Sequence, residues 1–357
     1  MKLATYQVHG STEIGALLPD GQRLARLQAA AQVFEGRQSP WFTDMLAFLR
    51  GDVAARNAAQ RLLEKFDRDP RPECGVALAD VCLLAPVPVP ESIREFMNFE
   101  QHVINCARKF GMPRWRQRID RFIERHVGRQ HTLAYRSSLP WYERPVYYKG
   151  NRFSVVGPEA QVQIPHYSQV FDYELEFGIF LSRGGRNIPR DQAHQHIGGY
   201  VIFNDFSARD IQSREMGGRL GPAKGKDFDT GNAMGPWLVT PDEVPDPYNL
   251  LMQARINGER VSVGRSSDMR FRFDDVLHYV SQAETLYPGE FFGSGTCSGA
   301  DGVGCGVEHG RFLRAGDVIE LEVEGLGVLR NRVVPAAADS RAAPILRPLQ
   351  PAQVGAR

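Results

Sequence analysis

The stretch that decides the fold runs from Phe171 to Leu181 and reads "FDYELEFGIFL". Apart from two glutamates, it has the composition of a buried strand. Side chains alternate between faces in an extended chain, so Glu174 and Glu176 point from one face and the intervening apolar residues from the other. The two carboxylates are then about 6–7 Å apart along the strand. Most pairs of this kind lie on an exposed strand face, so other residues must decide whether this one forms a site.

The overall composition is that of an ordinary globular protein. The chain has 357 residues, of which 42% are hydrophobic, and a formal net charge of +1. This length favours two domains over one. No block of basic residues interleaved with aromatics suggests a nucleic-acid partner, and no apolar run of about 18 residues suggests a membrane partner. The polar start does not read as a secretion signal, so we expect a cytoplasmic protein.

Cysteine and histidine spacing argues against zinc and disulfides. The five cysteines are odd in number and none form a CxxC pair, which speaks against a disulfide framework or a structural zinc site. His194 and His196 are two residues apart on an expected short helix, where they face different ways. We therefore interpret both histidines as surface residues.

A proline-rich segment marks the expected domain boundary. The sequence "APVPVP" over residues 85–90 can neither continue a helix nor donate fully to a sheet. We predict a small N-terminal domain over residues 1–85, a catalytic domain over 86–340 and a tail over 341–357. A helix is expected over residues 91–109.

Further acids can join the glutamate pair. Asp205 follows the apolar run "YVIF", a strand end where site residues are common, although an Asn-Asp turn is the simpler reading. On the expected helix, Glu95 and His102 are seven residues apart and share a face, while Glu100 points elsewhere. A lone helical histidine is more often structural than catalytic, so His102 depends on its neighbours for a functional reading.

Two glycine-rich loops carry the remaining candidates. "GPAKGKDFDTG" over residues 221–231 places Lys226 among glycines but lacks the Walker pattern of a phosphate-binding loop. "FFGSGTCSGADGVGCGVEHG" over residues 291–310 delivers Thr296 and Glu308 but has no GxGxxG before a helix, which excludes a dinucleotide site. Three or four carboxylates near one lysine indicate a hard cation such as magnesium or calcium. Without a counter-charge, such acids would repel one another.

Six motifs together point to a known family. They are "REFMNFEQHV", "PVYYKGNRFSVVG", "DYELEFGIFL", "FNDFSARDIQ", "KGKDFDTGNAMGPW" and "GSGTCSGADGVGCGVE", in this order between residues 85 and 335. In these motifs the sequence resembles the fumarylacetoacetate hydrolase family. The resemblance implies an α+β, β-rich fold with a mixed β-sheet roll and a small N-terminal domain. It also implies a homodimer with bound Mg²⁺, or alternatively Mn²⁺ or Ca²⁺.

The resemblance implies a role for each matching residue. The family's metal ligands fall on Glu174, Glu176 and Asp205, with Glu95 where the family usually has Asp. Lys226 and Thr230 fall beside the metal. The water-activating pair falls on His102 and Glu308. Positions that contact substrate or the developing oxyanion fall on Arg209, Gln212, Tyr148 and Thr296.

Departures from the family pattern bear on the substrate. Glu95 is one methylene longer than the usual ligand, which shifts its carboxylate by about one C–C bond. Met97 and Met216 replace tyrosines that meet the substrate, which favours a less polar or bulkier acyl group. Arg108 is the candidate for the family's substrate arginine.

The activity implied by the resemblance is metal-dependent hydrolysis of a C–C bond in a 1,3-dicarbonyl acid, of the acylpyruvate or acylacetoacetate type. Relatives that decarboxylate β-keto acids, or act as hydratases or isomerases, share the metal cage and remain the alternative. A non-catalytic, metal-dependent binder of small carboxylates is a third reading. His102 with Glu308 favours hydrolysis, because binding alone needs no water-activating pair.

Overall fold

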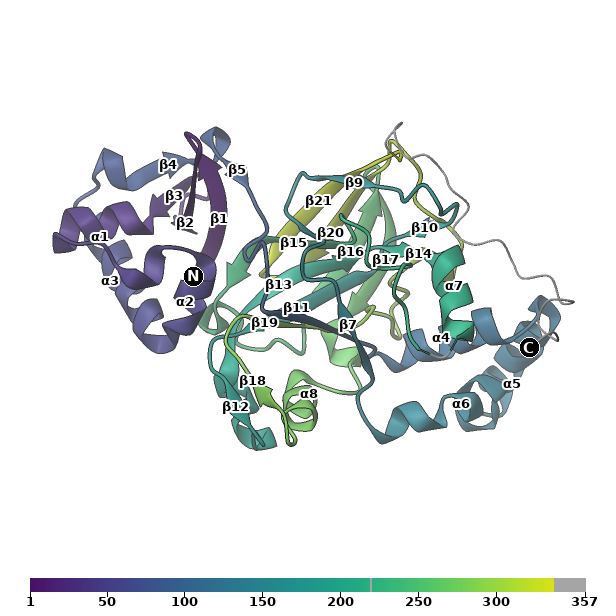
Figure 1. Cartoon of the computed structure of the whole chain (residues 1–357). Coiled ribbons are helices and arrows are strands. Elements are labelled where there is room, and N and C mark those ends of the chain that lie inside the picture. The colour runs from purple at the N-terminus through teal and green to yellow at the C-terminus, as the bar shows by residue number, and fades with distance from the viewer. Residues whose placement is uncertain (219, 337–357) are drawn as a thin grey trace, which may run out of the picture.

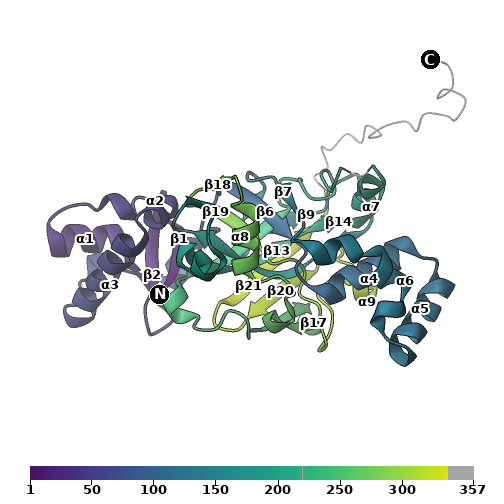
Figure 2. The ribbon, with the colours of Figure 1, turned by 90° about the horizontal axis from the view of Figure 1, so that it is seen from below.

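The computed structural model describes residues 1–218 and 220–336, so the predicted tail over 341–357 lies outside the described residues. The predicted α+β, β-rich fold is confirmed. A long mixed sheet runs through the molecule, and helices gather at the two ends of the molecule (Figures 1 and 2). No helix among the described residues combines the length and apolar character needed to cross a membrane.

The long sheet has the strand order β4-β3-β2-β1-β15-β13-β11-β19-β6-β7, with β5 paired to β1 and β8 paired to β15. Its strands are β1 Lys2–Val8, β2 Ser11–Leu17, β3 Arg23–Arg26, β4 Gly75–Ala77, β5 Cys82–Leu83, β6 Ser92–Phe96, β7 Tyr147–Gly150, β8 Val155–Val156, β11 Leu175–Leu181, β13 Ile197–Asp205, β15 Asn232–Val239 and β19 Glu290–Gly293.

A second sheet has the order β17-β16-β20-β21-β9. Its strands are β9 Gln161–Gln163, β16 Leu251–Ile256, β17 Glu259–Arg265, β20 Val318–Val323 and β21 Gly327–Val334, and two short pairs join β10 Phe171–Asp172 to β14 Ser207–Ala208 and β12 Gly185–Arg186 to β18 Thr285–Leu286. The α-helices are α1 Leu27–Glu35, α2 Met45–Arg50, α3 Asp52–Arg68, α4 Glu100–Gly111, α5 Arg114–His126, α6 Leu133–Ser137, α7 Arg209–Gly217, α8 Phe273–Val280 and α9 Gly306–His309.

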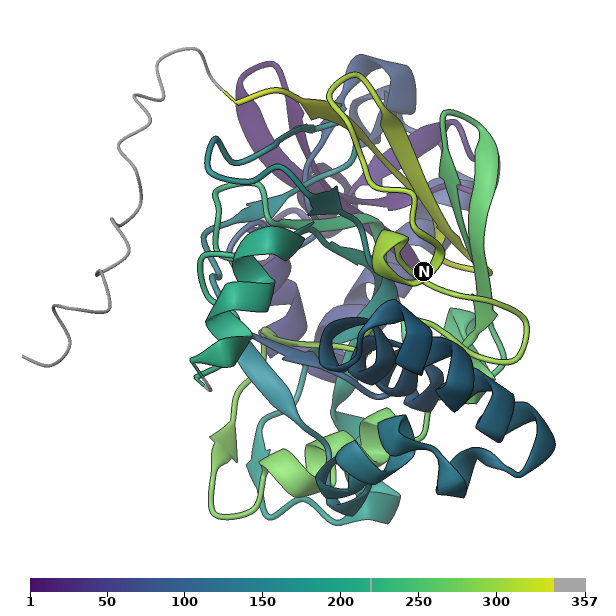
Figure 3. The same cartoon turned by 90° about the vertical axis from the view of Figure 1, so that its right-hand side faces the viewer.

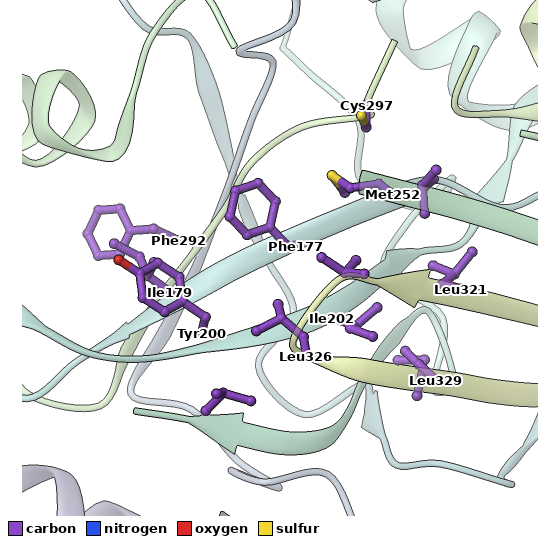
Figure 4. Packing of buried hydrophobic residues seen from close by; sticks show 14 of the residues in the cluster. Phe177, Ile179, Tyr200, Ile202, Met252, Phe292, Cys297, Leu321, Leu326 and Leu329 are labelled. Carbon is purple, nitrogen blue, oxygen red and sulfur yellow. The ribbon is translucent and has the colours of Figure 1, made fainter. Parts of the chain in front are cut away.

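The main core lies between the two sheets. Phe177 and Ile179 of β11 and Ile202 of β13 pack toward Leu321 and Leu329 of the second sheet (Figure 4). All five are buried to 1% exposure or less. Each such side chain contributes about 1.5–3 kcal/mol through the removal of apolar surface from water. This packing fixes the strands that carry the acidic residues.

The N-terminal strands extend the same sheet. β1 pairs antiparallel with β15, with Leu3 opposite Leu238, and α1, α2 and α3 gather at this end of the molecule (Figure 1). The domain boundary near residue 85 therefore stays a prediction, because the hydrogen-bonded sheet passes through it.

The decisive stretch is interrupted where the sequence suggested one strand. β10 ends at Asp172 and β11 begins at Leu175, and Glu174 forms an isolated bridge with Cys305 between them. Glu174 and Glu176 are only 5% and 1% exposed. The reading of an exposed strand face is thus wrong, because loop and helix residues cover both carboxylates.

The expected helix over residues 91–109 is also wrong in its first part. Residues Ser92–Phe96 form β6, which pairs in parallel with β19 and places Glu95 opposite Gly293, and α4 begins only at Glu100. Pairing with β19 and β7 overrides the helical spacing. Glu95 and His102 therefore do not share a helix face.

Both paired histidines lie at the surface, as predicted. His194 is exposed and His196 partly so, both on a 3-10 helix over Arg190–His196. All five cysteines are free among the described residues.

Candidate active site

Four buried carboxylates from three strands meet at one place. Glu174 precedes β11, Glu176 lies on it, Asp205 ends β13 and Glu95 lies on β6. Oxygen atoms of Glu174, Glu176 and Asp205 all lie within 4.8 Å of one another. We call these four residues the acid cluster. Strand pairing brings them together, since Leu175 is opposite Asn204 on β13.

Two oxygens of the acid cluster have no hydrogen-bond partner among the described residues. These are Oε2 of Glu95 and Oδ1 of Asp205, both fully buried. The backbone N–H of Gly295 donates to Oε1 of Glu95 at 2.9 Å and to Oε2 of Glu176 at 3.0 Å, which orients both carboxylates. Buried polar atoms are nearly always satisfied. Free lone pairs on converging carboxylates therefore fit a divalent cation.

A glycine accommodates the longer side chain of Glu95. A Cβ placed on Gly293 would collide with the Glu95 carboxylate. The carboxylate of Glu95, carried one methylene further than that of an aspartate, thus occupies space left by the missing side chain on β19. This close approach explains how a glutamate fits here.

Two buried cations partly neutralise the acid cluster. The ammonium of Lys226 donates to Oε2 of Glu174 and to Oδ2 of Asp205, each at 2.6 Å. The guanidinium of Arg209, at the start of α7, donates to Oε1 of Glu174 and to Oδ2 of Asp172, each at 2.8 Å. Glu174 is therefore ion-paired on both oxygens, whereas Glu95 has no ion-pair partner among residues 1–218 and 220–336.

The pKa shifts of the four carboxyl groups differ in direction. Burial raises the pKa of Glu95 and of Glu176 well above the usual range, and the repulsion of neighbouring carboxylates adds to this effect. Burial likewise raises the pKa of Asp205, to about 6, against the pull of Lys226. Although burial opposes ionisation, Arg209 and Lys226 lower the pKa of Glu174. Without a bound cation, the acid cluster therefore favours a partly protonated state. A cation that binds there would displace these protons.

A histidine–glutamate pair lies beside the acid cluster. Nδ1 of His102 on α4 is 3.5 Å from Oε1 of Glu308 on α9, and Nε2 is 4.0 Å from Oε1 of Glu174. We call His102 and Glu308 the dyad. Glu308 is held by donors from Asn105 Nδ2 at 2.8 Å, Ser298 Oγ at 2.7 Å and the Gly304 N–H at 2.9 Å.

The pKa values of both dyad residues are shifted by their surroundings. Despite its burial, Glu308 has a pKa lowered to about 2 by His102 and its hydrogen-bond donors. Burial disfavours charge on His102, but Cys106 and Glu308 raise its pKa well above the usual range. The ring can therefore hold a proton next to the acid cluster and pass it on.

Several predicted substrate residues surround this centre. The Tyr148 hydroxyl donates to Oδ2 of Asp205 at 2.7 Å, and the Thr296 hydroxyl lies 3.4 Å from Oε1 of Glu176. Gln212 accepts from Nη1 of Arg209 at 2.9 Å. Each of these groups is tied to a member of the site.

Thr230 and Arg108 bond to partners outside the acid cluster and the dyad, and the two predicted methionines differ in exposure. The Thr230 hydroxyl accepts from the Gln163 N–H at 3.0 Å rather than contacting a carboxylate. Arg108 is buried in ion pairs with Asp120 at 2.8 Å and Glu124 at 2.6 Å, so its guanidinium is already engaged. Met97 is half-buried, while Met216 on α7 is 52% exposed.

Asp172 and the residues that hold Glu308 were not predicted from the sequence. Asp172 is fully buried, accepts from the N–H groups of Gly306 and Val307 at 2.7 and 3.0 Å, and pairs with Arg209. It thus fixes the start of α9, which carries Glu308. Asn105, three residues after His102 on α4, could have been found from helical spacing.

Comparison with known proteins decides the family. A family model described as the fumarylacetoacetate (FAA) hydrolase C-terminal domain matches residues 93–334. The chain belongs to this family. The fumarylacetoacetate hydrolase match covers all members of the acid cluster and the dyad.

Curated relatives of the family include more than one kind of enzyme. The mitochondrial oxaloacetate tautomerase FAHD2A of Homo sapiens is 38% identical over 197 residues, which is 55% of this chain and 61% of that protein. A 2,4-didehydro-3-deoxy-L-rhamnonate hydrolase of Sphingomonas sp. (strain SKA58) is 38% identical over 201 residues, 56% of this chain and 68% of that protein. These two relatives are thus a tautomerase and a hydrolase.

Solved structures share the fold over nearly the whole chain. Maleylpyruvate hydrolase of Sphingobium sp. SYK-6, solved with manganese (II) ion and pyruvate, has a TM-score of 0.66 and 19% identity, covering 94% of this chain and 100% of that one. At this identity the likeness shows the fold.

Proposed function

We propose that this protein is a metal-dependent hydrolase that cleaves a C–C bond in a 1,3-dicarbonyl acid. The observation that carries the proposal is the dyad next to the acid cluster, with His102 Nε2 4.0 Å from Glu174 and Nδ1 3.5 Å from Glu308. A water-activating base beside a set of carboxylates suits hydrolysis.

Glu174, Glu176 and Asp205, with Glu95 as a variable fourth ligand, would hold the cation. Unpartnered oxygens on Glu95 and Asp205 support this assignment, and oxygen ligands suit Mg²⁺, Mn²⁺ or Ca²⁺. When bound, the cation would supply Lewis-acid stabilisation of negative charge on the dicarbonyl oxygens.

The dyad would handle the protons. For this step His102 must first lose the proton that its raised pKa favours. With Nδ1 oriented toward Glu308, the unprotonated Nε2 then takes a proton from water, and the resulting hydroxide adds to one carbonyl carbon of the substrate. The bond between that carbon and the central carbon then breaks, leaving a carboxylic acid and an enolate. His102 returns its proton to the enolate carbon, which completes hydrolysis.

Basic and amide groups around the acid cluster would bind and orient the substrate. Lys226 and Arg209 are buried and charged, and Gln212 is fixed by Arg209. Such preorganised donors stabilise an oxyanion without reorganisation. Met97 and Met216, where hydroxyls would otherwise stand, favour an acyl group that is larger or less charged than a fumaryl group.

A label experiment tests the reaction. Acylpyruvates and acylacetoacetates are incubated with the protein and Mg²⁺ or Mn²⁺ in ¹⁸O-water, and products are analysed by mass spectrometry. Hydrolysis places one labelled oxygen in the acid product, with loss of the enol absorbance. Release of carbon dioxide without that label would show that the protein is a decarboxylase and would contradict the hydrolase assignment.

A second candidate is a keto–enol tautomerase or isomerase. The raised pKa of His102 favours it, because a protonated imidazole can deliver a proton to an enol carbon. Similarity to the human oxaloacetate tautomerase points the same way. Rapid deuterium exchange at the carbon next to the keto group of a 2-oxo acid, with no cleavage products, would favour this candidate. The opposite result would favour hydrolysis.

A further inference from the structure

A cavity of about 500 Å³ is lined by residues of α4, α5 and α9 and by the loop over residues 299–303. Its volume falls within the range of about 300–1,000 Å³ that is typical of small-molecule sites. Helices α4 and α5 lie at the end of the molecule that faces the viewer in Figure 3, and α9 lies beside α4 (Figure 2).

The walls of this cavity are basic. Arg108, Lys109, Arg121 and Arg125 line it, and Glu124 is the acid that faces them besides Glu308. Arg108 and Glu124 are paired with each other at 2.6 Å.

The remaining cations are uncompensated. Lys109, Arg121 and Arg125 are exposed to solvent and form no ion pair among the residues that the structure describes. Because they come from two different helices, their charges converge on one space rather than spreading along one helix face. Three uncompensated cations at a concave wall attract an anion that carries more than one negative charge.

Polar groups at the inner wall add hydrogen-bonding capacity. Gln101 and Asn105 of α4 line the cavity. Asn105 donates to Oε1 of Glu308 at 2.8 Å, so the inner wall belongs to the support of the dyad. Glu308 also lines the cavity, and its side chain is only 1% exposed. No member of the acid cluster lines the cavity.

From these observations we propose a second ligand site, in which this cavity binds a small organic anion with two or three carboxylates. Lys109, Arg121 and Arg125 hold the carboxylates through charge-assisted hydrogen bonds, which are stronger than neutral ones. The proposal does not rest on the proposed hydrolase activity, because Lys109, Arg121 and Arg125 belong neither to the acid cluster nor to the dyad.

Calorimetric titration of the metal-free, full-length protein with citrate tests the proposal. Stripping the metal first prevents citrate from binding through a chelated cation. We expect one citrate per chain, and each of Lys109→Ala and Arg125→Gln should weaken binding by about tenfold, through loss of one charge-assisted hydrogen bond. Acetate, with one carboxylate, should bind far more weakly.

Two control variants make the result specific. Arg118→Gln removes an exposed arginine of the same helix that does not line the cavity, and it should leave citrate binding unchanged. Glu176→Gln alters the acid cluster and should also leave it unchanged. Absence of binding, equal weakening by Arg118→Gln, or loss of binding in Glu176→Gln would each overturn the proposal.

Discussion

The ammonium of Lys226 lies 2.6 Å from Oε2 of Glu174, and both side chains are buried. The same ammonium is 2.6 Å from Asp205, so one lysine neutralises two members of the acid cluster. This arrangement explains how four carboxylates can be packed together in the metal-free chain. It also means that Lys226 and a divalent cation act on the same negative charge.

We expect Lys226→Met to destabilise the metal-free protein strongly. Removing one partner of a buried ion pair costs about 3–5 kcal/mol, because an uncompensated charge is left behind. Added Mn²⁺ should recover part of this loss, so the rise in melting temperature on metal addition should be larger for Lys226→Met than for the parent. Lys149→Met, an exposed lysine on β7, is the matched control. Equal metal-induced shifts in both variants would contradict the shared-charge explanation.

Glu176→Gln should weaken metal binding. The substitution keeps the size of the side chain and removes one negative ligand, so we expect the Kd for Mn²⁺ to rise by about tenfold or more. Glu100→Gln changes a carboxylate that bonds to Tyr142 at 2.6 Å, outside the acid cluster, and should bind Mn²⁺ as the parent does. Unchanged affinity in Glu176→Gln would show that the acid cluster is not the metal site.

His102→Ala, Glu308→Ala and the double variant should lose activity to a similar residual rate. Groups that work as a unit lose activity non-additively, and the 3.5 Å approach of Nδ1 to Oε1 places these two in one unit. The measurement is kcat for C–C cleavage with the best substrate of the labelled-water panel. Losses that multiply in the double variant would mean that the residues act independently. Full activity in His102→Ala would instead favour decarboxylase or hydratase chemistry that needs no such base.

The overall fold could be predicted because its motifs are local in sequence. The alternation around Glu174 and Glu176 and the strand end at Asp205 are properties of single segments, and the structure places all three carboxylates together. Family resemblance then ordered these segments. Patterns within one short segment were sufficient to predict a site residue wherever its position depends on its own strand.

The position of Glu95 could not be read in the same way. Helical spacing to His102 suggested one helix, whereas residues Ser92–Phe96 form β6 because β19, nearly 200 residues later, offers a parallel partner. The collision that a side chain on Gly293 would cause with Glu95 is likewise visible only in three dimensions. Asp172, whose partners Gly306 and Arg209 are distant in sequence, was missed for the same reason.

Metal binding should become tighter as pH rises. Burial and neighbouring carboxylates raise the pKa of Glu95 and Glu176, and burial raises the pKa of Asp205 to about 6. In the metal-free chain these groups therefore hold protons at pH 5 that a cation must displace, so low pH opposes binding. For each proton that the cation displaces, the Kd for Mn²⁺ should fall by about tenfold for each unit that the pH rises, as long as the pH is below the pKa of that group.

Calorimetry between pH 5 and 7.5, in two buffers of different ionisation enthalpy, measures both the Kd and the number of protons released. Asp205→Asn removes one titrating group and should reduce both the proton count and the slope, while Glu100→Gln should change neither. A Kd that stays constant across this range would show that these carboxyls are already ionised before the metal binds.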